Sequence, residues 1–252
     1  MKKISSALVC VICLATIVNA DFTRVEIGGG AWQQTPTGAI LANNSTLTGS
    51  DSATEDGETQ GYVWAFVKHP VPIIPNLRLE YVGINSTGTA SGTFFNFTAP
   101  VGSASSLTMI QYDVIPYYNI LDNTFWISID LGIDVKIIES EYIVNGVSTN
   151  ASVNTSYTTS SSTVIPLLYA RARVQIPATN IGIESDAKYV SYDSNTIYDA
   201  RVKVDYTLGF IPAVQPALEV GYRIQHIETN GNEDVKIDME FSGVYVGLML
   251  RF

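Results

Sequence analysis

The stretch FWISIDLGIDVK, residues 125–136, indicates the fold more clearly than any other part of the chain. Large apolar side chains occupy every odd position from Phe125 to Val135, while Ser128, Asp130 and Lys136 stand at even positions. A period of two is typical of a β-strand with one apolar and one polar face. The alternation is longer than an ordinary strand and matches the roughly 9–11 residues that a tilted strand needs to cross a membrane.

The same alternation recurs along the chain and predicts ten strands. We expect them at 22–34, 60–68, 77–86, 106–120, 124–140, 163–176, 181–192, 197–210, 216–228 and 237–252. An even number of strands is what an antiparallel barrel of the outer-membrane type contains. Pro116 and Pro166 fall inside two of these strands. Because proline cannot donate to a strand ladder and a closed barrel has no free edge, we expect a β-bulge at each.

The connections between these strands fall into two alternating sets. Polar loops, most of them long and rich in Ser, Thr, Asn and Gly, are predicted at 35–59, 87–105, 141–162, 193–196 and 229–236, and short turns at 69–76, 121–123, 177–180 and 211–215. The low-complexity stretch 145–163 is expected to be a mobile surface loop. Loops on one rim and turns on the other predict an all-β fold, a ten-stranded antiparallel up-and-down transmembrane β-barrel with both mature termini periplasmic.

The composition limits the partners that the chain can have. Its 252 residues are 46% apolar and only 15% charged, which is too few charges for a disordered chain. Acidic residues outnumber basic ones by 24 to 14. This balance leaves no basic surface for a phosphate backbone, so nucleic acid is excluded as a partner.

The first twenty residues have the pattern of a secretory signal peptide. Lys2 and Lys3 precede an apolar stretch over 4–18, and Val18-Asn19-Ala20 supplies the small residues that a signal peptidase reads. We expect cleavage after Ala20, leaving residues 21–252 as one outer-membrane β-barrel domain. The apolar stretch is too short to be a spanning helix. Cys10 and Cys13 both lie in this segment, so disulfides and thiolate chemistry are excluded from the mature chain.

The last strand favours a membrane barrel over a soluble barrel, in which the apolar face would turn inward. It carries an apolar alternation that ends in an aromatic residue: Val244, Val246, Leu248, Leu250 and Phe252. This pattern resembles the assembly signal of bacterial outer-membrane barrels, which implies contact with the barrel-assembly machinery. The apolar face of every strand is therefore expected to contact outer-membrane lipid, and the polar face to line the lumen.

The polar faces of the strands carry ten basic and ten acidic residues, and these are the predicted lumen-facing charges. They are Arg24, Glu26, Arg78, Glu80, Asp113, Asp130, Asp134, Lys136, Arg171, Arg173, Glu184, Asp186, Lys188, Asp199, Arg201, Lys203, Asp205, Glu219, Arg223 and Arg251. A balanced set of charges in a narrow barrel predicts ion pairs that fill it, because buried charges are tolerated only when paired. A selective pore would instead show a surplus of one sign.

Several segments together resemble a family of small bacterial outer-membrane β-barrel proteins without an assigned function. They are Asp122-Asn123 with Trp126 and Asp130-Leu131-Gly132, then 189–193 (YVSYD), 220–224 (VGYRI) and 241–247 (FSGVYVG). The resemblance covers most of the mature chain. It implies the fold and an integral outer-membrane location, and it carries no activity or site residue.

Two classes of function follow from the sequence. The favoured one is a structural or surface-interaction barrel with an ion-pair-filled lumen and an unidentified extracellular partner, and the alternative is a narrow, porin-like channel for small solutes. An omptin-like surface protease would need His and Asp together at the outer rim, but His69 and His226 are expected on opposite rims. We therefore expect no enzyme, no cofactor and no histidine-bound metal, while the loop acids Asp51, Glu55, Asp56 and Glu58 leave open a loose divalent-cation site.

Overall fold

The computed structural model describes residues 23–42, 58–71, 73–94, 97–148, 154–192, 195–209, 214–229 and 235–252. The expected signal peptide and the acids Asp51, Glu55 and Asp56 lie outside these residues. The strands are β1 (Arg24–Gln33), β2 (Thr35–Ala42), β3 (Thr59–Lys68), β4 (Asn76–Phe94), β5 (Phe97–Thr124), β6 (Ile127–Ser148), β7 (Asn154–Gln175), β8 (Ile181–Tyr192), β9 (Asn195–Thr207), β10 (Gln215–Thr229) and β11 (Val235–Arg251). The described part of the chain contains no helix that is long and apolar enough to cross a membrane.

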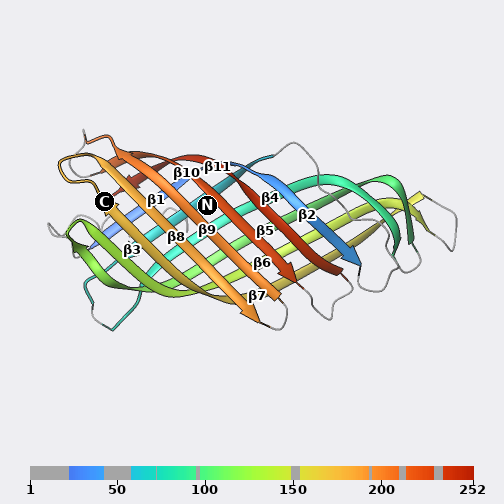
Figure 1. Ribbon diagram of the computed structural model, residues 1–252, viewed down its shortest axis with the longest axis horizontal. Coiled ribbons are helices and arrows are strands. Elements are labelled where there is room, and N and C mark those ends of the chain that lie inside the picture. Colours follow the sequence, from blue (N-terminus) through green and yellow to red (C-terminus); the bar gives the residue numbers. More distant parts are fainter. Residues whose placement is uncertain are drawn as a thin grey trace, which may run out of the picture.

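These strands form one antiparallel sheet that closes on itself (Figure 1). Each of β3 to β10 pairs with the next strand in sequence, and β1 closes the sheet by pairing with both β3 and β11. β1 and β2 run in one register along β11, since Glu26 pairs with Arg251 and Thr35 with Ser242, and only Gln34 interrupts them. The two segments act as one strand of the wall, so the predicted ten-stranded antiparallel barrel is confirmed.

The connections define two rims. The short-turn rim carries the links β3–β4, β5–β6, β7–β8 and β9–β10, and β4–β5, β6–β7, β8–β9 and β10–β11 are joined at the loop rim. Phe252 and Val25 exchange backbone hydrogen bonds of 2.9 and 3.5 Å, which places both described ends of the chain at the short-turn rim. The expectation that this rim faces the periplasm stays a prediction.

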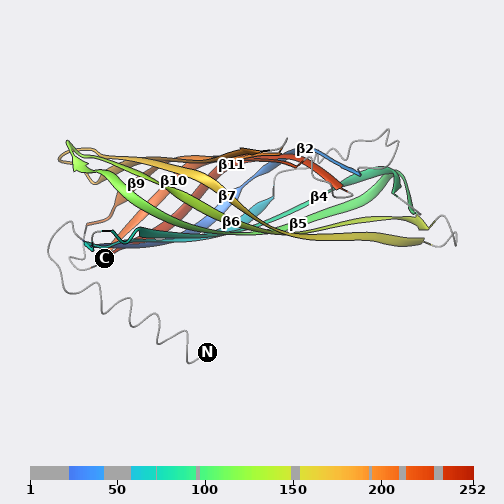
Figure 2. The same ribbon diagram turned by 90° about the horizontal axis from the view of Figure 1, so that it is seen from below.

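The main difference from the expected fold is the length of β4 to β7. These strands contain 19, 28, 22 and 22 residues, against 12 in β8 and 13 in β9. Figures 1 and 2 both show them continuing past the ends of β8 and β9 on the loop rim. The loops expected at 87–105 and 141–162 are therefore mostly strand. The expected mobile loop at 145–163 is likewise strand where β6 and β7 contain it. Paired strands satisfy the backbone of these Thr- and Ser-rich segments, and their low complexity did not indicate this.

Two further expectations were wrong. Pro116 and Pro166 produce no bulge, because the β4–β5 and β6–β7 ladders keep one register through Leu77–Pro116 and Val135–Pro166. β8 begins to pair with β7 only at Leu168, so Pro166 lies where β7 lacks a second neighbour among the described strands. The short turn expected at 121–123 lies at Phe125 and Trp126, because β5 extends to Thr124.

The polarity of the wall is that of a membrane barrel. Apolar side chains on its outer face are about half exposed, among them Leu131 at 47%, Val202 at 49% and Leu248 at 63%. On β6 this outer apolar series runs from Ile127 to Ile137 and gives way to Glu139. The inner face carries the charged side chains. We call the outer series the apolar belt, and it is the surface that lipid contacts in this class of fold.

Candidate functional site

The candidate site is the charged lumen, where the structure places the charges that the sequence assigned to the inner face. Eighteen of the twenty are buried, and the other two, Arg24 and Arg251, are partly buried at the short-turn rim. The buried ones are Glu26, Arg78, Glu80, Asp113, Asp130, Asp134, Lys136, Arg171, Arg173, Glu184, Asp186, Lys188, Asp199, Arg201, Lys203, Asp205, Glu219 and Arg223. So many buried charges can be tolerated only if they neutralise one another.

Strand register brings the first set of pairs together. Asp186 lies opposite Arg201 and Glu184 opposite Lys203 on β8 and β9, and both pairs point inward because side chains two apart share a face. Arg201 donates from Nε and Nη2 to Asp186 at 2.9–3.1 Å. Acidic residues on β8 therefore lie opposite basic residues on β9, and the strand pairing brings them together as ion pairs.

Glu80 on β4 joins opposite walls of the barrel. Its Oε1 accepts from Arg78 Nε and Arg201 Nη2, each at 2.5 Å, and its Oε2 accepts from Lys188 Nζ at 2.7 Å. β4 is not a neighbour of β8 or β9 in the sheet, so the bonds to Lys188 and Arg201 cross the lumen. A solute moving along the barrel axis would have to break these bonds.

Glu184 forms a second cross-lumen centre. Its carboxylate lies 2.7 Å from Arg171, 3.3 Å from Arg173, 3.4 Å from Arg78 and 3.5 Å from Lys203. Four cations from β4, β7 and β9 thus converge on one anion of β8.

The network continues to the short-turn rim. Arg173 binds both oxygens of Asp205 at 2.6 and 3.0 Å, and Arg251 binds Asp205 and Glu26 at 2.6 Å each. Arg24 binds Glu26 as well, at 2.6 Å. Arg171 also pairs with Asp130, which accepts from the Asn119 amide. Through Glu26 and Asp205, these bonds connect Arg251 of β11 to β1 and β9.

Toward the loop rim, the network ends in a group centred on Asp199. Arg223 binds both oxygens of Asp199 at 2.6 and 2.9 Å, and Lys136 binds Asp113 at 2.6 Å. Lys188 lies 2.5 Å from Asp113 and 3.8 Å from Asp134. Asp134 is the weakly bonded member, since its oxygens accept no hydrogen bond from the described residues.

Aromatic side chains fill the space between the ion pairs, and the sequence pattern did not identify them. Trp64 lies 4.5 Å from Lys203 Nζ and 5.3 Å from the Arg78 guanidinium, so it lies against two cations. Trp64 Nε1 and the Tyr62 hydroxyl both donate to Glu219 Oε1, at 3.1 and 2.7 Å. The segment 62–67 is apolar on both faces, which hid the direction of these rings in the sequence.

Glycine on the neighbouring strand β1 makes room for these rings. Gly28 lies directly opposite Trp64, and a Cβ added at Gly28 would approach the indole to 2.5 Å. The missing side chain leaves room for the ring. Because residues 28–30 are all glycine, they leave room on both faces of β1, and the glycines alone do not orient the rings.

Above the ion pairs, the interior becomes apolar. Gln111 and Gln225 exchange side-chain hydrogen bonds of 2.6 and 3.2 Å at the boundary. Most of the buried side chains beyond them are apolar, and the apolar ones include Ile84, Leu107, Met109, Ile138, Ile197, Ile227, Met239 and Phe241. The uncharged polar side chains of Gln60, Ser86 and Ser105 are buried in the same region. The described lumen is therefore occupied by two successive layers, one ionic and one apolar.

The two histidines lie on opposite rims, as expected. His226 points outward from β10, stacks on Tyr198 with ring centres 5.1 Å apart, and lies 3.8 Å from Asp238. The Tyr198 hydroxyl donates to Glu240 at 2.9 Å. Within the described residues, this group stands on the outside of the wall and not over the lumen.

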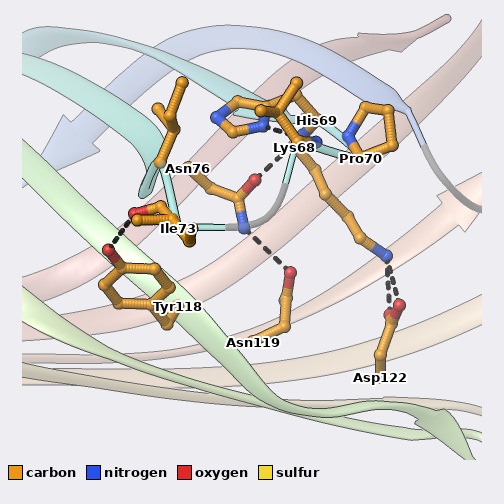
Figure 3. A pocket seen from close by; sticks show the side chains of 10 residues that line it. Lys68, His69, Pro70, Ile73, Asn76, Tyr118, Asn119 and Asp122 are labelled. Carbon is orange, nitrogen blue, oxygen red and sulfur yellow. Dashed lines mark hydrogen bonds and ion pairs between the residues drawn. The ribbon is translucent and has the colours of Figure 1, made fainter.

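His69 belongs to a pocket of about 220 Å³ on the short-turn rim (Figure 3). The amide of Val71 donates to its Nδ1 at 3.2 Å, and its Nε2 donates to the Pro75 carbonyl at 3.1 Å. Both ring nitrogens therefore hold the β3–β4 turn. Lys68 pairs with Asp122 at 2.6 Å across the same pocket.

The described residues contain no group of three or more His, Cys, Asp or Glu side chains placed to hold a metal ion. The predicted assembly signal lies on the outer wall, where Val244, Val246, Leu248 and Leu250 are exposed and Phe252 is partly buried. Its recognition by assembly machinery stays a prediction.

Comparison with solved structures gives likenesses at the level of the barrel fold. The attachment invasion locus protein Ail of Yersinia pestis is 10% identical with a TM-score of 0.36, over 92% of this chain and 99% of that one. The outer-membrane protease OmpT of Escherichia coli is 11% identical with a TM-score of 0.40, over 94% and 99%. The translocator domain of the autotransporter NalP of Neisseria meningitidis is 11% identical with a TM-score of 0.40, over 100% and 96%. No protein-family profile and no curated protein sequence matches the chain.

The class of protein follows from the wall and the lumen of this chain. A closed antiparallel barrel with an apolar outer belt and a charged interior is an integral outer-membrane β-barrel. The likenesses to solved structures concern the fold alone.

Proposed function

We propose that the protein is a closed outer-membrane barrel that serves as a structural or surface-interaction scaffold and conducts no solute. It lies in outer-membrane lipid with the loop rim outside, and its last strand is read by the assembly machinery. No enzymatic activity is assigned to it.

One observation carries this proposal: the lumen charges bind one another across the barrel. Glu80 on β4 binds Lys188 on β8 and Arg201 on β9, and Glu184 contacts cations of β4, β7 and β9. A conducting pore needs a continuous water path along the barrel axis. Buried pairs that span the lumen and an apolar layer above them support a filled interior.

The variant Arg201→Glu tests this role. It removes the partner of Glu80 and Asp186 and adds a third carboxylate among them. In a filled lumen, we expect the free energy of unfolding to fall by about 3–5 kcal/mol, because uncompensated buried charge is costly. Urea unfolding of the purified barrel in detergent, followed by the shift between folded and unfolded gel mobility, measures this change.

Arg24→Glu is the matched control, since the Arg24 side chain is 32% exposed at the rim. We expect it to cost no more than about 1 kcal/mol. Equal stability of the two variants, together with ion selectivity shifted toward cations by Arg201→Glu, would assign the barrel to the channels.

A further inference from the structure

Strand β7 presents a free edge on the loop rim. β8 pairs with β7 only from Leu168 to Gln175, and β8 ends at Tyr192, three residues beyond its last pair with β7. β7 continues to Asn154 and pairs there only with β6 among the described strands. Its backbone from Thr158 to Thr163 therefore has one row of amide and carbonyl groups without a strand partner in the described part of the chain.

This edge lies above the apolar belt. The outward side chains of β7 change from apolar at Val164, Pro166 and Leu168 to polar at Ser162, Ser160 and Thr158. On β6 the change falls at the same height, because Ile137 pairs with Val164 and Glu139 with Ser162. The six residues from Thr158 to Thr163 extend about 20 Å in a position that water and other proteins can reach.

The edge lacks the features that normally protect an exposed strand. Natural edge strands carry lysine, inward charges, proline or a bulge to prevent pairing with another chain. Residues 158–163 read TTSSST, with no charge and no proline, and the β6–β7 ladder runs through them without a register shift. Ser160 and Ser162 face outward and are exposed.

The charge beside the edge selects the partner. The described residues of β4 to β7 beyond the belt carry two charged side chains, Glu139 and Glu141, and both are acidic and exposed. They lie directly opposite Ser162 and Ser160 on the outer face. A strand added to β7 would lie two strand spacings, about 10 Å, from β6, and a long basic side chain can cover this distance over the small Ser160 and Ser162 side chains.

We propose that the β7 edge over Thr158–Thr163 binds an extended basic polypeptide segment of another protein by strand addition. Main-chain hydrogen bonds to β7 supply the affinity, and Lys or Arg at alternate positions of the added strand pairs with Glu139 and Glu141. This inference rests on the proposed role as a surface-interaction scaffold and names its binding surface and partner class.

The experiment uses the full chain in lipid nanodiscs and a fluorescent ten-residue peptide of alternating Lys and Val. We expect saturable binding, and about tenfold weaker binding to the double variant Ser160→Lys with Ser162→Lys, since two new cations face the basic strand. Thr89→Lys with Ala104→Lys adds the same charge to an exposed pair on β4 and β5, and it should leave the affinity unchanged. A peptide of equal charge with proline at every second position should not bind.

Three results would overturn the inference: no binding, equal binding of the proline peptide, or equal weakening by both double variants, because the last two indicate attraction to charge alone. If two barrels associate, and only the double variant Ser160→Lys with Ser162→Lys abolishes this association, the partner of the edge is a second copy of the chain. That result would contradict the proposal of a basic segment from another protein. A conductance measurement separates the two proposals. A barrel that conducts no ions and binds no peptide refutes only the strand-addition inference. A barrel that conducts ions and binds the peptide refutes only the closed scaffold.

Discussion

Phe125 and Trp126 form the β5–β6 turn with φ values of 52° and 66°. Asn and Gly normally occupy two-residue hairpin turns of this kind, because other side chains are strained at positive φ. The Phe125 side chain is 82% exposed and Trp126 is 53% exposed, so packing within the protein does not explain the choice. Their place at the short-turn rim fits an interfacial aromatic girdle, and backbone strain accompanies that position.

Replacing both residues, Phe125→Asn with Trp126→Gly, should raise the free energy of unfolding in detergent micelles by about 2 kcal/mol, because it relieves strain at two positions. Urea unfolding of the purified barrel measures the effect. Phe125→Ala with Trp126→Ala removes the rings but keeps side chains at positive φ, and it should give no increase. An increase of the same size in both variants would show that the rings, and not the backbone, determine the difference.

At the scale of single strands, the apolar belt sets where a charge is tolerated on the outer wall. Val202 lies midway between Tyr198 and Tyr206 on the outward face of β9, and it is 49% exposed. Thr158 lies on the outward face of β7, beyond the end of the belt. Both side chains are exposed on the outer wall, so the two positions differ in whether lipid or water surrounds the side chain.

We therefore expect Val202→Arg to destabilise the barrel in phospholipid by about 2–4 kcal/mol, and Thr158→Arg to change its stability by less than about 1 kcal/mol. Folding titrations in bilayers of defined thickness measure both values. Similar costs at the two positions would place Thr158 inside the bilayer and would also remove the basis of the β7 binding edge.

The sequence predicts those features of the strands whose cause lies within a single strand. Side-chain parity placed Asp186, Arg201, Glu184 and Lys203 on the inner face, because a strand fixes the direction of alternate residues. The same reasoning failed at 62–67, where both faces are apolar and parity alone does not show which face points inward. The reasoning also failed at 141–162, which was expected to be a loop. Beyond the apolar belt, a segment can pair as a strand without an apolar alternation, so the sequence pattern did not reveal these strands.

The contacts between distant strands could not be predicted from the sequence at all. Glu80 and Arg201 are 121 residues apart and meet because the closed barrel carries β4 and β9 to opposite sides of a narrow lumen. Which charges face one another across that lumen depends on strand tilt and stagger, which the hairpin pattern does not specify. The balance of ten basic and ten acidic side chains predicted neutralisation but not the partners.

At the scale of the whole molecule, we propose that the side chains of the barrel close its lumen to water. Ion pairs join the walls from the short-turn rim to Asp199, and apolar side chains such as Ile197 and Phe241 occupy the interior beyond them. An ion would meet bonded charges and then an apolar layer, and both raise the barrier to its passage.

The conductance of the wild-type protein in a planar lipid bilayer tests this closed state most directly. Purified barrel, with insertion verified by its resistance to urea extraction, should give no unitary current steps in molar salt at either polarity. Reproducible steps of one size would contradict the account, because they require a continuous water path through the layer that Glu80 and Glu184 hold together.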